Sequence, residues 1–346
     1  MPLARHQAGR TPDLGALQDA STAPAPLLRG STRPLTGYLH PGYAESLAEF
    51  GAPRRLPFSG GWVLERPIPE SSDSDAMGCY PLFVCADWDK LPLDLDLLSR
   101  DLVSLTLVAD PFGNFHIEDL RRSFDLVLPF KQHLVTDLSQ PVSSCVSSHH
   151  RYYARWALRN LRVEQCRQPL SFLDDWVALY ANLQAKHNIT GIRAFSRTAF
   201  AKQLSVPGLV MFRACAHDAV AGIVLFYVQG DVAYGHLSAA SAAGYKLRVT
   251  YALLWRALES LRDEVRWVDH GSAAGLNSDN TDPLWQFKAG WSTCTRTAFL
   301  CGKIFQPHRY SRLVSSRRIG PATYFPAYRA GEYGAYRPGD YKEPVL

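Results

Sequence analysis

The chain has 346 residues, 47% hydrophobic and 12% aromatic, which is enough for a globular protein of two ordinary domains. Its longest apolar stretch, residues 219–228, is about half the length of a membrane-spanning helix, and the N-terminus lacks the apolar core of a secretion signal. Seven cysteines without a CxxC pair fit a reducing compartment, so we expect a cytoplasmic protein without a membrane span. The net charge, +5, is small but unevenly distributed.

The first part of the chain predicts an N-terminal domain. Residues 1–37 contain no aromatic residue and are rich in Ala, Pro, Gly, Ser and Thr, so we expect them to be disordered. A domain is expected over residues 38–142, with a polar loop at 69–76. Its expected elements are strands at 62–68, 80–87 and 103–109, a helix at 91–100 and an extended run at 124–138. Strands that alternate with helices predict an α/β fold, or an α+β fold with a mixed sheet.

A C-terminal domain is expected over residues 143–305. The serines of SSCVSS are expected to cap a helix that runs from about residue 149 to 161. Further helices are predicted at 174–187, 196–204 and 246–262, and strands at 209–216, 222–228, 232–238 and 265–271. The last strand–helix–strand unit predicts a right-handed parallel crossover. Residues 306–346 form a basic segment rich in Tyr and Pro.

Positive charge is concentrated toward the C-terminus. From Pro283 to Gly331 the chain has no Asp or Glu. The lysines and arginines of this stretch are Lys288, Arg296, Lys303, Arg309, Arg312, Arg317, Arg318 and Arg329. Such a segment favours a phosphate-bearing partner such as CoA, a nucleotide-sugar or RNA. The alternative is a solvated segment whose charge is balanced by acidic residues elsewhere in the chain.

Arginines recur along the helix predicted near residue 150. Arg151, Arg155, Arg159 and Arg162 are spaced by four, four and three residues, which lays them along one helix face. These side chains could bind phosphate groups bidentately, or they could form a solvated face.

The motifs of several enzyme classes are absent. The sequence has no GxSxG, no Walker loop and no GxGxxG after a strand, so hydrolase, P-loop and dinucleotide-binding functions lack their usual evidence. His149, His150 and His133 could suggest a metal, but no second pair of ligands stands at zinc-like spacing. We therefore expect no metal.

Two segments carry polar groups suited to catalysis. Asp269 and His270 end the crossover strand, where ligands gather in sheets of this kind, and either could remove a proton from an attacking amine. Both could instead be structural, and His236 on the neighbouring strand is a weaker candidate. Lys288 stands in the aromatic segment WQFKAGW, which is predicted to be strand-like. Its ammonium could reach water, or it could stabilise anionic charge in a site.

A family resemblance rests on these segments. The sequence GYKLRVTYALLWRALESLRDEVRWVDHGSAAG…DPLWQFKAGW resembles the GNAT-fold acyltransferases, and more closely their Fem-type branch, which joins amino acids to cell-wall precursors using aminoacyl-tRNA. The matching positions are Tyr251 and Trp255 on the helix, Asp269 to Gly275 at the strand end, and Phe287, Lys288, Gly290 and Trp291 in the tail. HHRYYARWALRN is similar to the basic helix before the second GNAT domain of that branch. The resemblance covers about 145–300 and, more weakly, 38–140.

The resemblance implies tandem GNAT-like domains and an N-acyltransferase. The amine of a sugar, a peptide or an envelope-polysaccharide precursor would attack an acyl group activated as an acyl-CoA, for example acetyl-CoA, or alternatively as an aminoacyl-tRNA. Lys288 would stabilise phosphate or oxyanion charge, and Asp269 or His270 would remove the proton. The implied donor-binding residues are Lys246, Arg248, Thr250 and Tyr251. The implied acceptor-binding residues are Arg151, Arg155 and Arg159.

The chain departs from the family in two places. Acetyl-CoA enzymes of this fold carry an Arg/Gln-x-x-Gly-x-Gly/Ala loop for the pyrophosphate, and residues 245–250 have no such glycines. The long coiled-coil arm of some Fem-type enzymes has no counterpart either. Two other functions therefore stay open. One is a non-catalytic module that binds a nucleotide or RNA, and the other is a scaffold of an envelope-polysaccharide system that docks through its basic segment.

Overall fold

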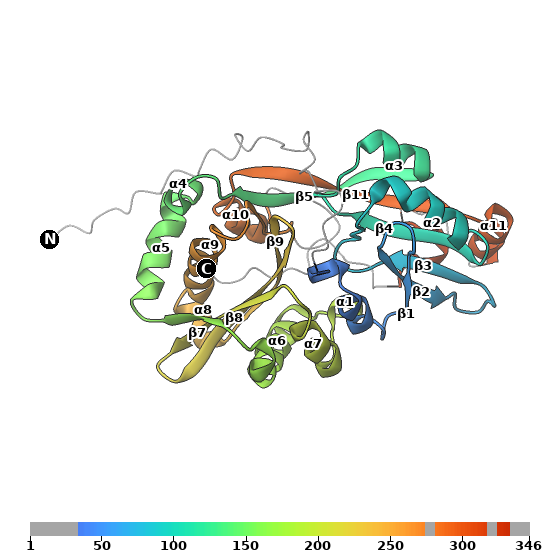
Figure 1. The fold of residues 1–346 in the computed structure, drawn as a ribbon. Helices are drawn as coiled ribbons and strands as arrows, with labels where there is room; N and C mark the ends of the chain where they lie inside the picture. Colours follow the sequence, from blue (N-terminus) through green and yellow to red (C-terminus); the bar gives the residue numbers. More distant parts are fainter. Residues whose placement is uncertain (1–33, 274–280, 317–323, 333–346) are drawn as a thin grey trace.

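The structure, a computed structural model, describes residues 34–273, 281–316 and 324–332. Its strands form one sheet in the order β1-β2-β3-β4-β11-β5-β10-β9-β8-β7-β6 (Figure 1). The strands are β1 (Ala52–Arg55), β2 (Trp62–Pro67), β3 (Ser74–Gly78), β4 (Leu102–Ala109), β5 (Leu126–Asp137), β6 (Arg162–Cys166), β7 (Leu209–Ala216), β8 (Ala219–Gln229), β9 (Val232–Ala240), β10 (Trp267–Asp269) and β11 (Cys294–Ile304).

The helices cover both faces of this sheet. They are α1 (Pro41–Ser46), α2 (Leu91–Leu98), α3 (Ile117–Ser123), α4 (Val142–Cys145), α5 (Ser148–Leu158), α6 (Leu173–His187), α7 (Arg197–Leu204), α8 (Ala242–Lys246), α9 (Val249–Leu261), α10 (Pro283–Ala289) and α11 (Pro307–Ser316). A mixed sheet of this kind confirms the predicted fold class. None of the described helices combines the length and the apolar composition needed to cross a bilayer.

The long strands β5 and β11 join the two halves of the molecule. Residues 294–302 of β11 pair antiparallel with β5, and residues 299–304 pair antiparallel with β4. On its other side β5 pairs with β10, which in turn lies parallel to β9. Figure 1 shows both strands running across the top of the molecule from one half to the other. The sheet is therefore continuous through the junction.

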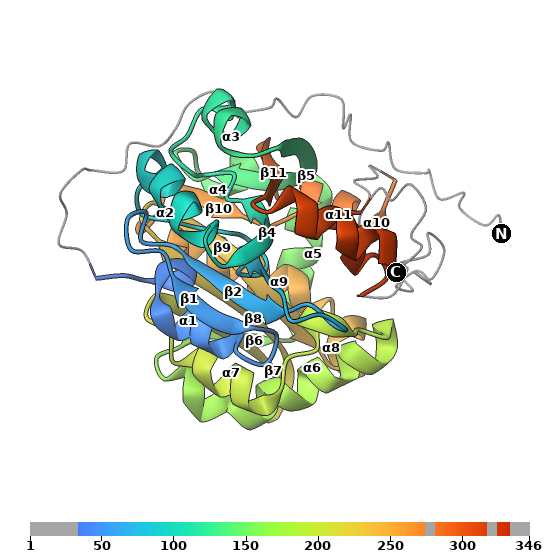
Figure 2. The same cartoon turned by 90° about the vertical axis from the view of Figure 1, so that its right-hand side faces the viewer.

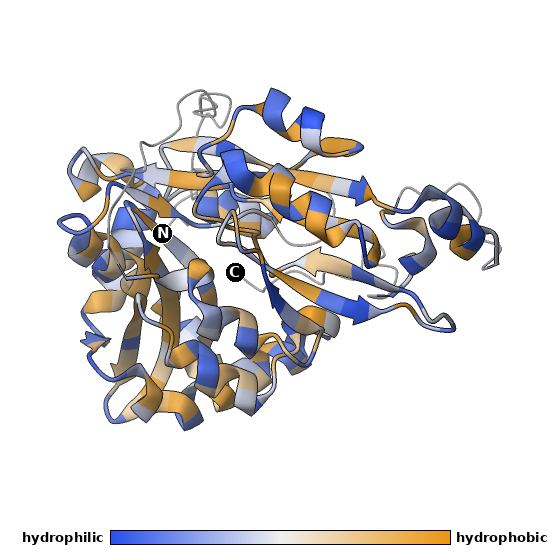
Figure 3. Ribbon diagram, turned by 45° about the vertical axis from the view of Figure 1, so that its right-hand side comes forward, coloured by the Kyte–Doolittle hydropathy of each residue, from blue (hydrophilic) through white to orange (hydrophobic). Residues whose placement is uncertain are grey.

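In the C-terminal half, two apolar layers enclose the sheet. One face packs against α5 and α9 through a core that includes Ala157, Leu258 and Trp291. The opposite face packs against α1, α6 and α7 through Tyr43 and Trp176, among others. Figures 1 and 2 show α6 and α7 side by side along the lower edge of the molecule. In Figure 3 hydrophobic and hydrophilic residues alternate along these helices, as expected for helices that cover a sheet with one side.

The predicted crossover is confirmed. Strand β9, helix α9 and strand β10 follow one another, and β10 pairs parallel with β9 in the register Trp267 to Val232. Ser147 caps α5 as predicted, because its hydroxyl accepts a hydrogen bond from the backbone N–H of His150. Ser196 caps α7 in the same way through the N–H of Ala199.

The order of elements near residue 80 was predicted wrongly. The segment 69–76 was expected to be a polar loop, but β3 begins at Ser74 and lies between β2 and β4. Asp75 can occupy this buried strand because Arg66 and Arg329 neutralise its carboxylate. The segment 80–87, expected to be a strand, makes one isolated bridge from Phe83 to Ala109 and otherwise packs as irregular backbone.

The segment WQFKAGW is a helix and not strand-like. Asp282 caps α10 by accepting hydrogen bonds from the N–H groups of Leu284 (2.8 Å) and Trp285 (3.0 Å), and Pro283 occupies the first helical position. The small-residue stretch at 239–244 completes β9 and begins α8. The cap at Asp282 and the proline at 283 thus favour a helix in WQFKAGW despite its strand-like composition.

Two other boundaries also differ from the prediction. Helix α5 ends at Leu158, so Arg159 is its C-cap and Arg162 begins β6, which shortens the predicted arginine ladder. At the N-terminus, Gly37 opens a short 3₁₀ helix (Gly37–Leu39) and donates a backbone hydrogen bond to Pro207 O (2.9 Å). The expectation of disorder for residues 1–33 lies outside the described residues.

The basic C-terminal stretch packs against acidic residues of the N-terminal half. Arg309 and Arg312 of α11 approach Asp73 at 3.2 and 3.4 Å, and Lys303 approaches Asp125 at 3.1 Å. The alternative of acidic balance elsewhere in the chain therefore accounts for these cations. Arg317 and Arg318 lie outside the described residues.

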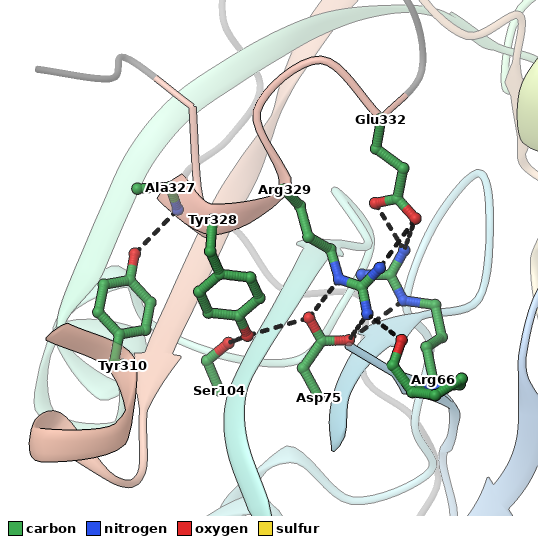
Figure 4. A network of polar contacts seen from close by, with 9 residues as sticks. Arg66, Asp75, Ser104, Tyr310, Ala327, Tyr328, Arg329 and Glu332 are labelled. Atoms are coloured by element: carbon green, nitrogen blue, oxygen red, sulfur yellow. Dashed lines mark hydrogen bonds and ion pairs between the residues drawn. The ribbon is translucent and has the colours of Figure 1, made fainter. Parts of the chain in front are cut away.

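The centre of this docking is a buried cluster around Asp75 (Figure 4). Its carboxylate accepts hydrogen bonds from Arg329 Nη2 (2.9 Å), Arg66 Nε (3.3 Å) and the Tyr328 hydroxyl (3.0 Å). Tyr328 also shares a hydrogen bond of 2.6 Å with Ser104 on β4. The 3₁₀ turn of Ala327–Arg329 is thereby fixed to β3 and β4, and Arg329 is a structural cation.

Candidate active site

The two parallel strands β9 and β10 separate at their carboxyl ends. Their pairing ends at Tyr234 and Asp269, after which β9 continues along β8 to Ala240. The chain after β10 instead follows β5, since His270 N donates to Leu134 O (2.9 Å) and Leu134 N donates to Gly271 O (2.9 Å). This divergence, called the opening below, leaves β9 and β10 unpaired inside the sheet, at the carboxyl ends where ligands bind in sheets of this class.

A β-bulge marks the same position on β9. Gly235 pairs with Phe226 and Leu237 pairs with Leu225, which leaves His236 as the extra residue. The His236 ring hydrogen-bonds the Tyr38 hydroxyl (3.2 Å) and Gln203 Oε1 (3.3 Å). Burial lowers the pKa of His236 to about 3, so the ring stays neutral and serves the aromatic core.

Asp269 points to the interior between the two halves. Its Oδ2 lies 2.8 Å from His133 Nδ1, and its Oδ1 accepts the Gly271 N–H at 2.7 Å. Burial opposes ionisation, but His133 and the Gly271 N–H outweigh it and hold the pKa of the Asp269 carboxyl below its usual value. The result is an ionised carboxylate that fixes a histidine.

The sequence did not suggest this role for His133. His133 was weighed only as a metal ligand, and it lies 136 residues before Asp269. The two side chains meet because β5 pairs with β10 in the register Val135 to Asp269. No local pattern encodes that register.

His270 lies on the opposite face from Asp269, because neighbouring residues of a strand alternate. Its Nε2 is 2.8 Å from Thr136 Oγ1, and this hydroxyl donates its proton to Trp291 O at 2.6 Å. Thr136 can therefore only accept from His270, so His270 Nε2 carries a proton. Burial lowers the pKa of His270 to about 4. The structure thus separates the two residues that were predicted to share one role.

Lys288 reaches the end of β10 from α10. Its Nζ donates to Ser272 O at 2.7 Å, and a Cβ placed on Gly271 would lie 3.3 Å from the same Nζ. Burial lowers the pKa of Lys288 to about 8, while Asp269 and Asp282 act in the opposite direction. Lys288 and Asp269 thus flank the same turn. The predicted Asp269–Gly275 segment is described only as far as Ala273.

The predicted donor-binding residues surround the start of α9. Lys246 is exposed at the end of α8, and Arg248 adopts a left-handed backbone conformation (φ 54°) as the N-cap of α9. The Arg248 guanidinium lies 5.0 Å from the centre of the Tyr153 ring. Thr250 is half-buried in the first helical turn. Tyr251 is buried among aromatic rings, with the His150 ring at 5.1 Å, and therefore belongs to the core.

The three predicted acceptor-binding arginines lie away from Asp269. Arg151 donates to the Ser143 carbonyl, while Arg155 and Arg159 are exposed and form no ion pair among the described residues. All three belong to α5 or its C-cap, and α5 packs against α9 on the face opposite to Asp269. The structure does not bring them to the opening between β9 and β10.

Two further buried charges, Asp110 and Arg296, were not predicted as residues of this site. Asp110 follows β4 and accepts hydrogen bonds from the Tyr234 hydroxyl (2.8 Å) and Phe112 N (3.0 Å), and burial raises its pKa to about 6. The Arg296 guanidinium lies between the rings of Phe112 (4.4 Å) and Trp267 (5.0 Å). Both residues border the junction of the halves, and only the three-dimensional sheet order brings them there.

Neither metal ligands nor disulfides are found around the opening. Among the described residues, no three His, Cys, Asp or Glu side chains gather as a metal site. All seven cysteines are buried, and none of them forms a disulfide in the described part of the chain. A hollow of about 410 Å³ between α2 and α3, lined by Trp88, Phe115 and Arg122 among others, lies in the N-terminal half, away from Asp269 and Lys288.

Comparison with known proteins finds a family model that matches part of this chain. A family model described as an acetyltransferase (GNAT) domain matches residues 147–275, which include α9 and the end of β10. The solved structure of FemX is 13% identical, with a TM-score of 0.60 over 81% of this chain and 95% of that chain. L-PGS from Bacillus licheniformis is 12% identical, with a TM-score of 0.51 over 84% of this chain and all of that chain (100%).

A third solved structure has a similar fold. It is the C-terminal DUF2156 domain of an Agrobacterium fabrum protein assigned as a lysylphosphatidylglycerol synthetase, 13% identical with a TM-score of 0.56 over 75% of this chain and 87% of that chain. No curated protein matches the chain. At these identities the structural likeness concerns the fold, and the GNAT domain match concerns the class of chemistry. Residues 147–275 therefore match a GNAT acetyltransferase domain, and the fold of the chain is similar to that of FemX.

Proposed function

We propose that the protein transfers an acyl group from an acyl-CoA to the amine of a sugar, a peptide or an envelope-polysaccharide precursor. The observation that carries this proposal is the opening between β9 and β10, which is flanked by a lysine ammonium and an ionised carboxylate. Thioesters are already activated, so positioning of the amine and stabilisation of charge suffice for catalysis.

The reaction assigns a specific task to Lys288. The amine nitrogen attacks the thioester carbon, the C–N bond forms, and negative charge develops on the carbonyl oxygen. Collapse of this intermediate breaks the C–S bond and releases the CoA thiolate, while the amine proton passes to a base. The Lys288 ammonium donates one N–H to Ser272 O (2.7 Å). Its two other N–H groups can donate to the developing oxyanion.

The donor phosphates are assigned to the start of α9. The positive end of the helix dipole lies at this N-terminus, and Lys246 and Arg248 add positive charge beside it. These features replace the glycine-rich loop that residues 245–250 lack.

Replacing Arg248 with alanine is expected to weaken donor binding roughly tenfold or more, because a charged hydrogen bond to phosphate contributes about 1.5–3 kcal/mol. The measurement is the Kd of acetyl-CoA by titration calorimetry. Arg256→Ala is the matched control, since Arg256 is exposed on the same helix and pairs with Glu259. Equal Kd values for the two variants would remove Arg248 from the donor site.

Replacing Lys288 with methionine tests the proposed function directly. The expected loss is about 10²–10³-fold in kcat, the range for removal of one oxyanion donor. The assay follows thiol release from acetyl-CoA with glucosamine or glycylglycine as the amine probe. Lys90→Met is the control because Lys90 is exposed on the N-terminal half. A folded Lys288→Met variant with wild-type kcat would exclude this role.

The pH dependence of kcat provides a second test of the role of Lys288. The ammonium of Lys288 is present below its pKa of about 8 and is lost as the pH rises through that value. Wild-type kcat should therefore fall above about pH 8, and the falling limb should be absent from Lys288→Met.

Aminoacyl-tRNA is the alternative donor. The likeness in fold to FemX and to L-PGS over most of the chain, together with the missing glycine-rich loop, favours this alternative. Thermal-shift measurements with acetyl-CoA, longer acyl-CoAs, UDP-sugars and charged tRNA separate the cases. Stabilisation by a CoA thioester supports the proposed donor, and stabilisation by tRNA alone supports the alternative. Binding without turnover would support a non-catalytic module, and no binding would favour a scaffold.

A further inference from the structure

His133 is held in one orientation by a buried carboxylate. Asp269 Oδ2 lies 2.8 Å from His133 Nδ1, and the other carboxylate oxygen is fixed by the Gly271 N–H at 2.7 Å. Because an ionised carboxylate can only accept, His133 Nδ1 carries the proton in this pair. The lone pair of the neutral ring is therefore on Nε2.

The Nε2 atom is available. It has no hydrogen-bond partner among the described residues, and about a tenth of the His133 side chain (10%) is open to solvent. His270, by contrast, uses its protonated Nε2 to hold Thr136 on the other face of the sheet. The hydroxyl of Tyr234, on the neighbouring strand β9, donates its hydrogen bond to Asp110. His133 thus offers a free basic nitrogen at the divergence of the strands.

We propose that His133 Nε2 is the general base that removes the proton from the attacking amine, and that Asp269 is its positioning residue. This inference rests on the proposed acyl transfer. As the C–N bond forms, the amine proton moves to Nε2, and the imidazolium is stabilised by the adjacent carboxylate. The proton then returns to the departing CoA thiolate, so the enzyme ends in its starting state.

The charged groups that face His133 are of both signs. Asp269 on β10 and Asp110 after β4 are the acidic ones. The basic ones are Arg296, its partner across the β5–β11 ladder, and Lys131 on its own strand. Lys288 approaches from α10 and interacts with the same Asp269.

The decisive experiment compares His133→Gln with His270→Gln in the thiol-release assay. The amine probe is chosen with a pKa below the range of the pH profile, so that its own ionisation does not contribute. His133→Gln is expected to lower kcat about 10²–10⁴-fold and to remove the rising limb of the profile. His270→Gln is expected to keep the rising limb. Wild-type kcat with an unchanged rising limb in His133→Gln would overturn the proposal, as would loss of the limb in His270→Gln alone.

Two further variants separate catalysis from folding. His133→Ala leaves a space that free imidazole can enter, so added imidazole should restore part of kcat; a failure to restore it in a folded variant counts against the base. Asp269→Asn should lower kcat and leave the KM of the amine unchanged, because Asp269 fixes His133 and the Gly271 turn and contacts no substrate in the proposed mechanism. If wild type transfers acyl groups and Lys288→Met is inactive while His133→Gln is normal, the proposed function stands and this inference fails. If wild type itself transfers none, the proposed function fails first.

Discussion

Replacing Asp75 with alanine is expected to destabilise the folded protein by about 3–5 kcal/mol, the cost of breaking a buried ion pair. Asp75 is fully buried, and its carboxylate balances Arg66 and Arg329, whose side chains are almost as deeply buried. Without it, two guanidinium groups would face each other beside Glu332, whose carboxylate lies 3.2 Å from Arg66 and 3.0 Å from Arg329 (Figure 4). Urea unfolding at neutral pH measures the change.

Controls for this prediction come from the same half of the molecule. Glu118→Ala removes an exposed pair with Arg121 and should change the free energy of unfolding by no more than about 0.5 kcal/mol. Arg329→Ala should approach the effect of Asp75→Ala, and the double variant should show strong coupling between the two sites. An Asp75→Ala variant that loses less than about 1 kcal/mol would show that the cluster does not hold the C-terminal turn.

Replacing Gly244 with alanine is also expected to lower the free energy of unfolding strongly. A Cβ on Gly244 would lie 2.0 Å from Ala221 O and 2.9 Å from the same carbonyl carbon, which is backbone of β8 and cannot rotate away. That carbonyl also accepts the N–H of Ser241 at 2.9 Å, the bond that starts α8. Helix α8 must therefore shift, at a cost of about 1–3 kcal/mol from overpacking.

The shift of α8 should also affect the donor site, because Lys246 and Arg248 follow directly after Gly244. We expect a higher Kd for acetyl-CoA together with the loss of stability, measured by calorimetry and by urea unfolding. Ala243→Ser, at an exposed position of the same helix, is the matched control and should change neither quantity appreciably. An unchanged Kd in a destabilised Gly244→Ala variant would separate α8 from donor binding.

Most of the C-terminal fold could be predicted from the sequence, because its elements have local signals. The alternation of apolar residues in β9 and the helical period of α9 predicted the crossover that β10 completes. Predictions failed where a distant or specific contact decides the structure. Asp75 lies in a strand because Arg329, far along the chain, neutralises it, and α10 forms because Asp282 and Pro283 start it.

The candidate site was only partly predictable for the same reason. Asp269 and Lys288 were selected from their positions at a strand end and in an aromatic segment, and the structure places both beside Gly271. That Asp269 and His270 point to opposite faces follows from strand geometry alone. The contact of Asp269 with His133 depends on the pairing of β5 with β10, which no local pattern specifies.

The path of β11 has a consequence for the order of folding during synthesis. Strands β1 to β4 are made first, but the second edge of β4 is covered only when residues 299–304 arrive, and Asp75 meets Arg329 later still. Until then the early half exposes an unpaired strand edge, which invites wrong contacts, and Asp75 is balanced by Arg66 without Arg329. The N-terminal half is therefore not a unit that matures on its own. Its completion requires residues 299–304 and Arg329, so a chain truncated before residue 329 lacks contacts that complete its N-terminal half.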